Sequence, residues 1–198
     1  MLVLAAAALV ALPVAGCSDD GNGAGTARRE PVTGSFVGAV AGSDAYVAIV
    51  VGPRGDALAY VTDGAWSVDW LDGTLHRGAA ALGNQGGATI DAKFGRGRVT
   101  GSFTRPQSPT LTFSAQPARA PAGLYRARED FADGLYVGGW VVLPDGTERG
   151  TVRRYETPLA PGEVDATTFM PGDESFTVPG GVLRPDLVRP SADLSLPS

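Results

Sequence analysis

TIDAKFGRGRVTGSFT, residues 89–104, alternates polar and apolar side chains through two halves that meet at Gly95-Arg96-Gly97. Side chains of a β-strand point alternately to its two faces, so each half has the pattern of a strand with one buried face and one wet face. A short glycine turn between two such strands is typical of an antiparallel hairpin. The stretch therefore predicts strands over 89–94 and 98–104, paired as a hairpin.

The same two-residue period recurs on both sides of this hairpin. We expect about nine or ten strands, at the short spacing typical of barrels and sandwiches. The earlier strands are more apolar than the later ones. Turn residues separate the strands at Pro53–Asp56, Asp63-Gly64, Asp72-Gly73 and Pro144–Thr147. Besides the hairpin, the expected strands cover residues 35–40, 46–51, 57–62, 66–70, 110–115, 135–143 and 148–153.

These patterns fix an expected fold class. No segment of ten residues carries a 3.6-residue apolar period with caps, so we expect helices to be at most brief and do not expect a parallel βαβ fold. Many short hairpins in series produce an antiparallel meander, and closing the meander removes its exposed edges. We therefore expect an all-β protein whose single domain, residues 34–155, is a small β-barrel or a barrel-like sandwich.

The chain after Tyr155 has a different composition. Residues 156–198 form a Pro-rich C-terminal extension, with too many prolines for a sheet interior or a helix. Phe169, Phe176 and Val178 are candidates to pack as a strap over the domain, and the chain from Arg189 onward is expected to be disordered.

The only cysteine, Cys17, follows an apolar run from Leu2 to Leu12. This run is too short to span a bilayer, which needs about 20 apolar residues as a helix, and it has the length of a signal-peptide core. The sequence Val14-Ala15-Gly16-Cys17 resembles the lipobox of bacterial lipoproteins. The resemblance implies that a diacylglyceryl group is attached to the Cys17 sulfur and that a peptidase cuts between Gly16 and Cys17. Residues 1–16 would then be a signal peptide.

The physical setting of Cys17 agrees with this interpretation. A lone cysteine cannot form an internal disulfide, and its polar surroundings offer no core to join. Two acyl chains anchor stably, because each buried CH₂ contributes about 0.8 kcal/mol. We expect residues 17–33 to form the lipidated N-terminus and a flexible tether. No Lys or Arg precedes the apolar run, so we expect the true translation start to lie upstream.

The composition of the chain limits the expected cellular location of the protein and the classes of partner that it binds. The chain has 21 acidic against 16 basic residues and no strongly basic stretch, so nucleic acid is not an expected partner. Lys93 is the only lysine, and Ile49 and Ile90 are the only isoleucines. This bias matches GC-rich coding and, with the lipobox, suggests an actinobacterial cell envelope. The expected location is the extracytoplasmic face of the cell membrane.

The residues that usually carry catalysis are sparse. His76 is the only histidine, near an expected turn, and no Gly-x-Ser-x-Gly motif accompanies it. One histidine and one lipidated cysteine are too few ligands for zinc. The Gly83–Gly87 stretch lacks the ending of a phosphate loop. We expect no metal and no cofactor. Acids that still allow a carboxylate-based hydrolase are Asp44, Asp63, Asp69, Asp72 and Asp91.

Aromatic residues leave two hypotheses open. They fill the core, or they line a barrel mouth that binds a lipid or stacks on sugars. The candidates are Tyr46, Tyr60, Trp66, Trp70 and Trp140.

The expected function is accordingly that of a lipid-anchored envelope protein without enzymatic activity, which binds a small or lipidic ligand. The first alternative is a protein–protein contact module of the envelope, and the second is the hydrolase. A lipid binder should enclose an apolar pocket, whereas a contact protein should have a filled core and an exposed apolar patch.

Overall fold

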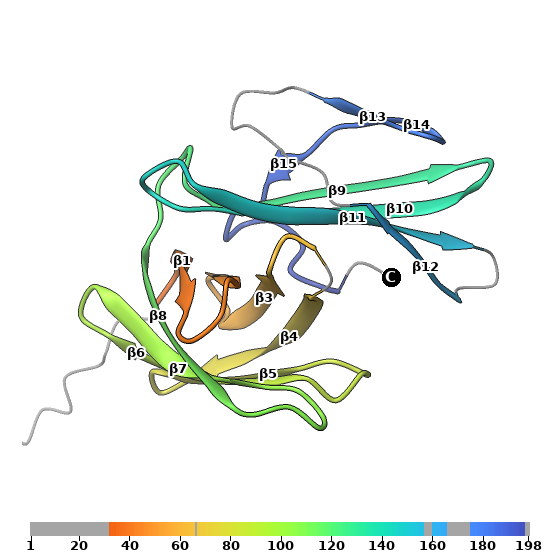
Figure 1. Cartoon of the computed structure of the whole chain (residues 1–198). Helices are drawn as coiled ribbons and strands as arrows, with labels where there is room; N and C mark the ends of the chain where they lie inside the picture. Colours follow the sequence, from red (N-terminus) through yellow and green to blue (C-terminus); the bar gives the residue numbers. More distant parts are fainter. Residues whose placement is uncertain (1–31, 66, 157–159, 166–174, 197–198) are drawn as a thin grey trace, which may run out of the picture.

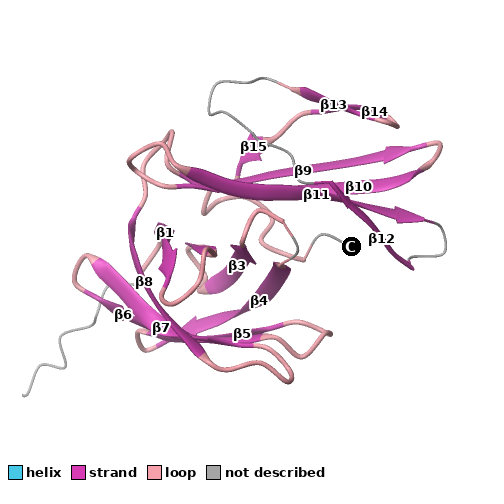
Figure 2. Ribbon diagram, viewed as in Figure 1, coloured by secondary structure: helices cyan, strands magenta, loops and turns pink. Residues whose placement is uncertain are grey.

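The computed structural model describes residues 32–65, 67–156, 160–165 and 175–196. Within these ranges every regular element is a β-strand, and all the strand pairs are antiparallel (Figures 1 and 2). The all-β fold class and the antiparallel meander are confirmed. No helix in the described ranges is long and apolar enough to cross a membrane.

The first eight strands form a closed barrel in sequence order. Closure comes from pairing between the first and last of them, which places Val40 opposite Phe113 and Phe36 opposite Pro117. The barrel strands are β1 (Gly34–Val40), β2 (Tyr46–Val51), β3 (Asp56–Thr62), β4 (Val68–His76), β5 (Ala79–Gly83), β6 (Thr89–Gly95), β7 (Arg98–Thr104) and β8 (Leu111–Pro117).

The remaining strands form a second layer. A five-stranded sheet in the order β12-β11-β10-β9-β15 lies across one side of the barrel, and the hairpin β13-β14 lies on the sheet's other side (Figure 1). These strands are β9 (Gly123–Phe131), β10 (Gly134–Val142), β11 (Glu148–Glu156), β12 (Ala160–Asp165), β13 (Phe176–Val178), β14 (Gly181–Leu183) and β15 (Asp186–Leu187). The structure thus divides the region expected as one β domain, 34–155, between a barrel and a covering sheet.

Alternation along the barrel strands explains both layers. Val47, Ile49 and Val51 of β2 point into the barrel, while Ala48 and Val50 point outward. The outward faces of β1 to β3 also carry buried apolar residues, which pack against the second sheet. This second core contains Val37, Ala48, Val50, Leu58, Tyr60, Leu124, Val141, Val188 and Leu194.

Two expected local features are wrong. Asp72-Gly73 is not a turn, because β4 continues through it to His76 and turns at Arg77-Gly78. Both turn residues have positive φ, 51° and 82°. The C-terminal segment from Arg189 is also ordered as far as Leu196. Leu194 is buried in the core between barrel and sheet, and Arg126 donates hydrogen bonds to the carbonyl oxygens of Asp193 and Ser195.

Candidate functional site

The barrel interior is filled by side chains. Four phenylalanines converge there with small aliphatic residues, and Phe36 meets Phe94 edge-to-face with ring centroids 5.4 Å apart. Every interior residue of this core is at most 7% exposed. A barrel of eight strands is just wide enough for its own side chains to fill it. The expected lipid-binding interior is therefore packed with the chain's own side chains.

An open groove lies instead on the outer wall of the barrel, over β4 to β8. Its volume is about 890 Å³. Its outward-facing side chains belong to two rows that cross the strands side by side. The first row is Thr74, Ala81, Asp91, Ser102 and Thr112, and each is directly opposite the next. The second row is His76, Ala79, Lys93 and Thr100.

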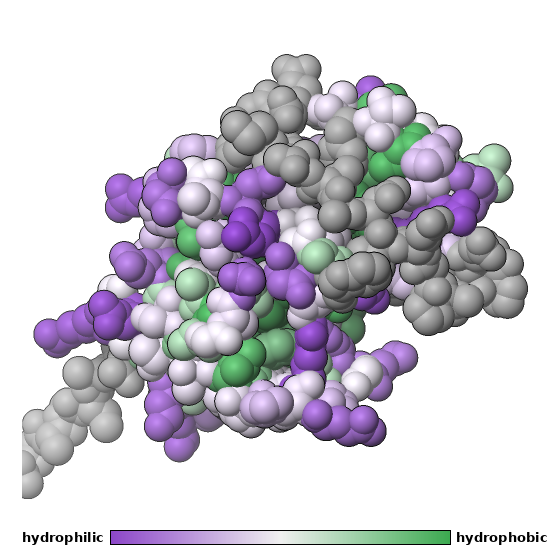
Figure 3. All heavy atoms as spheres, in the orientation of Figure 1, coloured by the Kyte–Doolittle hydropathy of each residue, from purple (hydrophilic) through white to green (hydrophobic). Residues whose placement is uncertain are grey.

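Small residues produce this hollow. Ala79 and Ala81 are the exposed positions of β5, and Gly101 of β7 exposes its backbone between Thr100 and Ser102. With strands about 4.8 Å apart, the five-residue row extends roughly 19 Å across the sheet and the four-residue row roughly 14 Å. Such a width suits an extended segment of a partner better than a compact small molecule. Figure 3 shows hydrophobic surface in the barrel half of one view, bordered by hydrophilic residues.

The groove offers polar groups above an apolar floor. Hydroxyls of Ser102 and three threonines face outward, together with Asp91 and Lys93. Within the described part of the chain, neither Asp91 nor Lys93 forms an ion pair. These groups can donate and accept hydrogen bonds along a docked chain. The structure thus brings the sole histidine, His76, to the edge of a surface that also carries the sole lysine.

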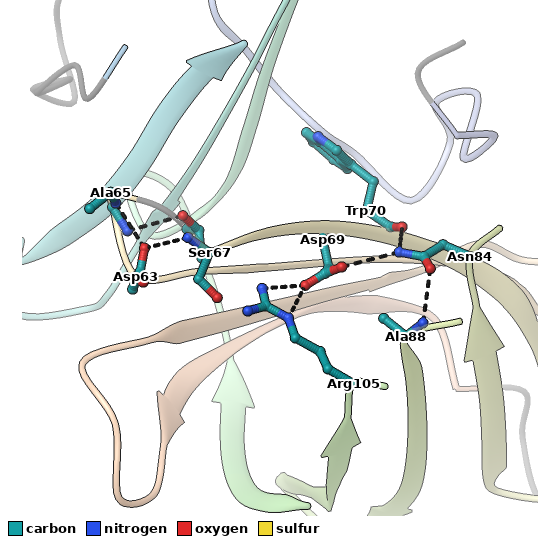
Figure 4. A network of polar contacts seen from close by, with 10 residues as sticks. Asp63, Ala65, Ser67, Asp69, Trp70, Asn84, Ala88 and Arg105 are labelled. Carbon is teal, nitrogen blue, oxygen red and sulfur yellow. Dashed lines mark hydrogen bonds and ion pairs between the residues drawn. The ribbon is translucent and has the colours of Figure 1, made fainter. Parts of the chain in front are cut away.

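A polar network closes one end of the barrel (Figure 4). Arg105 donates from Nε to Asp69 Oδ2 at 2.6 Å, and its guanidinium forms an ion pair with the same oxygen. Asn84 donates to Asp69 Oδ1 at 3.2 Å and accepts from the Ala88 amide at 3.0 Å. The Trp70 ring points away from this network. The Asp69 carboxylate thus links the β5–β6 loop to the β7–β8 loop.

The acids proposed for a hydrolase do not form one cluster. Asp44 and Asp63 line a small hollow of about 250 Å³ at the barrel end that carries Arg105. The Asp63 carboxylate accepts hydrogen bonds from the amides of Ala65 and Ser67 at 2.8 and 2.9 Å, which hold the β3–β4 loop. Asp72 and Asp91 lie on the outer wall of the barrel, on β4 and β6. Among the described residues no three His, Cys, Asp or Glu side chains are grouped as metal ligands.

The candidate aromatic residues are distributed over two packing layers. Tyr60 and Trp70 stack with ring centroids 4.3 Å apart, on the barrel face that the second sheet covers. Gly139 of β10 faces this pair, and a Cβ there would lie 2.6 Å from the Trp70 ring and 2.7 Å from the Tyr60 ring. Tyr46 lies at the edge of this layer, where its hydroxyl donates to Thr147 at 3.1 Å. Trp140 is fully buried on the opposite face of the sheet.

Burial sets the ionisation of Tyr60. Desolvation in the layer between barrel and sheet raises the pKa of Tyr60 to about 12. The hydroxyl has no hydrogen-bond partner among the described residues. Tyr60 is therefore neutral at physiological pH and serves as a packing group.

Among the residues of the sequence hypotheses, Gly16, Cys17, Trp66 and the strap candidate Phe169 lie outside the described ranges. The predicted lipidation and cleavage at Gly16-Cys17, like the role of Trp66, stay predictions. Sequence reasoning did not find the groove, because its floor consists of alanines and glycine that carry no motif. The register of five strands is needed to bring its residues together.

No protein-family model matches the chain, and comparisons with curated proteins and with solved structures find no significant relative.

Proposed function

We propose that the protein is a lipid-anchored envelope protein without enzymatic activity, which uses the outer groove of its barrel to bind a partner. Cys17 carries the anchor in this proposal, and the tether of residues 17–33 connects it to β1. A Gly-rich coil of this length spans roughly 20 to 25 Å, so the barrel stays near the membrane surface.

The filled barrel interior is the observation that carries the proposal. The hypothesis of an enclosed lipid or small ligand requires empty space inside the barrel. Four phenylalanines occupy that space. The open groove favours the contact module, because it can accept an extended segment of another envelope protein along its length. Two residues of opposite charge, Asp91 and Lys93, which form no ion pair with any described residue, lie within it to fix the orientation of that segment.

Site-specific photocrosslinking in the native cells tests the groove. A photoreactive residue at Ala81, in the groove floor, should give a discrete adduct in the membrane fraction. The matched control is Ala132, which is exposed in the β9–β10 turn on the second sheet. Adding Ser102→Arg should abolish the Ala81 adduct by filling the groove with a long charged side chain. Equal adducts from Ala81 and Ala132 would contradict a specific site.

Mass spectrometry separates the two binding hypotheses and tests the anchor. Intact-mass analysis of the protein from native membranes should show a diacylglyceryl mass on Cys17 and no residues before it. An unmodified Cys17 would refute the anchor. A non-covalent lipid or metabolite that co-purifies in stoichiometric amount, and that Ser102→Arg does not displace, would favour the small-ligand hypothesis over the contact module.

A further inference from the structure

The two ends of the barrel carry different charges. In an up-and-down barrel the loops that follow even-numbered strands all lie at one end, together with the start of β1. These loops are residues 52–55, 77–78, 96–97 and 118–122. Each of the four contains one arginine and no acid: Arg54, Arg77, Arg96 and Arg119. We call this end the arginine end.

The four arginines are available for binding. All are exposed, and among the described residues none forms an ion pair or a side-chain hydrogen bond. The acid at the strand termini of this end is Asp56, whose half-buried carboxylate lies against Gly52 of the β2–β3 turn. Arg54 lines a hollow of about 260 Å³ together with Asp56, Asp72 and Asp193. Arg77, Arg96 and Arg119 line none of the hollows described here.

The other end of the barrel has the opposite character. Its loops carry Asp44 and Asp63, and their arginine, Arg105, is paired with Asp69. The charge asymmetry therefore runs along the barrel axis. Since β1 begins at the arginine end, the preceding chain also leaves from that end.

We infer that the arginine end is the membrane-facing surface of the barrel and binds the headgroups of anionic phospholipids. The inference rests on the proposed anchor, because residues 17–33 would join the lipidated Cys17 to this same end. Exposed arginines near an anionic surface each strengthen binding by about fivefold, the factor that corresponds to ~1 kcal/mol. The groove would then lie on the side wall of a barrel whose acidic end points away from the lipid.

Vesicle binding tests the surface without the anchor. The full chain with Cys17→Ser is mixed with phosphatidylcholine vesicles, with and without about a third of phosphatidylglycerol. The apolar N-terminal run contributes equally in every variant. The ratio of the affinity for vesicles with phosphatidylglycerol to the affinity for vesicles without it therefore measures the contribution of the anionic headgroups. Arg54→Gln, Arg77→Gln, Arg96→Gln and Arg119→Gln together should lower this ratio by at least tenfold, and added salt should remove the difference.

A matched pair of single variants distinguishes an effect of where the arginine lies from an effect of the net charge of the protein. Arg77→Gln removes one charge at the arginine end, and Arg184→Gln removes one from the exposed link between β14 and β15, beyond the second sheet (Figure 1). Arg77→Gln should lower the ratio several-fold, whereas Arg184→Gln should change it by less than about twofold. Equal effects of the two, or an unchanged ratio for the fourfold variant, would overturn the inference.

Amide hydrogen exchange gives a readout of orientation that needs no arginine variant. On vesicles with phosphatidylglycerol, loops 52–55, 77–78, 96–97 and 118–122 should exchange more slowly than in solution, and loops 41–45 and 63–67 should not change. Protection at the acidic end would overturn the inference. Because Cys17→Ser is used throughout, failure here leaves the anchor intact, and an unmodified Cys17 in native protein leaves the vesicle result intact.

Discussion

Tyr60, buried in the layer between barrel and sheet, makes the stability of the protein depend on pH. The unfolded chain releases the tyrosine proton near its ordinary pKa of 10, whereas burial raises the folded pKa to about 12. Between these values the folded state binds more protons than the unfolded state, so the free energy of unfolding falls as pH rises. The full loss is roughly 2 to 3 kcal/mol for a shift of this size.

Tyr60→Phe should remove this part of the alkaline destabilisation. At neutral pH we expect the variant to be as stable as the wild type or slightly more stable, because it replaces a buried hydroxyl that lacks a hydrogen bond. Urea unfolding of both proteins from neutral pH to about pH 12 measures the difference. The raised pKa values of Tyr125 and Tyr136 are common to both proteins. Parallel losses of stability would contradict the assignment.

Asp69 is the residue that closes the barrel end. Its side chain is 15% exposed and that of Arg105 is 30% exposed, so solvent screens the pair only in part. Asp69→Asn should destabilise the protein by about 1 to 3 kcal/mol, because Arg105 loses its charged acceptor. A double-mutant cycle with Arg105→Gln should give a coupling energy above about 0.5 kcal/mol. Asp91→Asn, on the exposed wall, is the control and should change stability by less than about 0.5 kcal/mol.

Barrel closure at the level of strands depends on glycines that let neighbouring backbones approach. A Cβ on Gly73 of β4 would overlap the Ala81 carbonyl of β5, and a Cβ on Gly101 would overlap the Asp91 carbonyl of β6. Gly73→Ala should therefore cost about 1 to 3 kcal/mol through forced separation of β4 from β5. Gly95→Ala is the matched control, since a Cβ there would meet its nearest atom at 3.5 Å. Chemical denaturation compares the two, and equal costs would argue against a close-approach role.

Strands with a clear alternating or continuous apolar run, such as β2, β3, β6 and β7, could be predicted from the sequence, whereas β5 and β9 could not. β6, β7 and β8 alternate clearly because their outward residues are polar. The sequence does not indicate β5, because its exposed positions are alanines, and it does not indicate β9, because the bulky Tyr125 and the charged Arg126 interrupt a simple pattern. Asp72-Gly73 suggested a turn, but the same glycine is what a tight strand approach requires. Asp69 lies two residues before the buried Leu71, which already placed its carboxylate on the inward side of β4.

At the scale of the whole molecule, the sequence contained a sign of the second layer that the one-domain prediction did not use. β2 and β3 are apolar on both faces, a pattern expected only for strands covered on both sides. The aromatic residues could not be assigned to core or ligand from sequence, because Tyr60 and Trp70 contact a sheet formed more than fifty residues later. The groove likewise exists only once five strands are in register.

The same shared core predicts that barrel and sheet unfold together. Leu124 of β9 is fully buried in the core between the sheet and the outward face of the barrel, which also contains Val37 and Leu58. Leu124→Ala should cost about 2 to 5 kcal/mol, and the loss should appear in both layers. Amide exchange measures this directly. β6 and β7 are barrel strands with no residue in the shared core, so they report on the barrel, whereas β10 reports on the sheet. Under conditions where exchange reports global unfolding, protection of all three strands should fall by the same free energy. If β10 lost protection while β6 and β7 kept theirs, the sheet would be a separate folding unit, and the shared core would not couple the two layers.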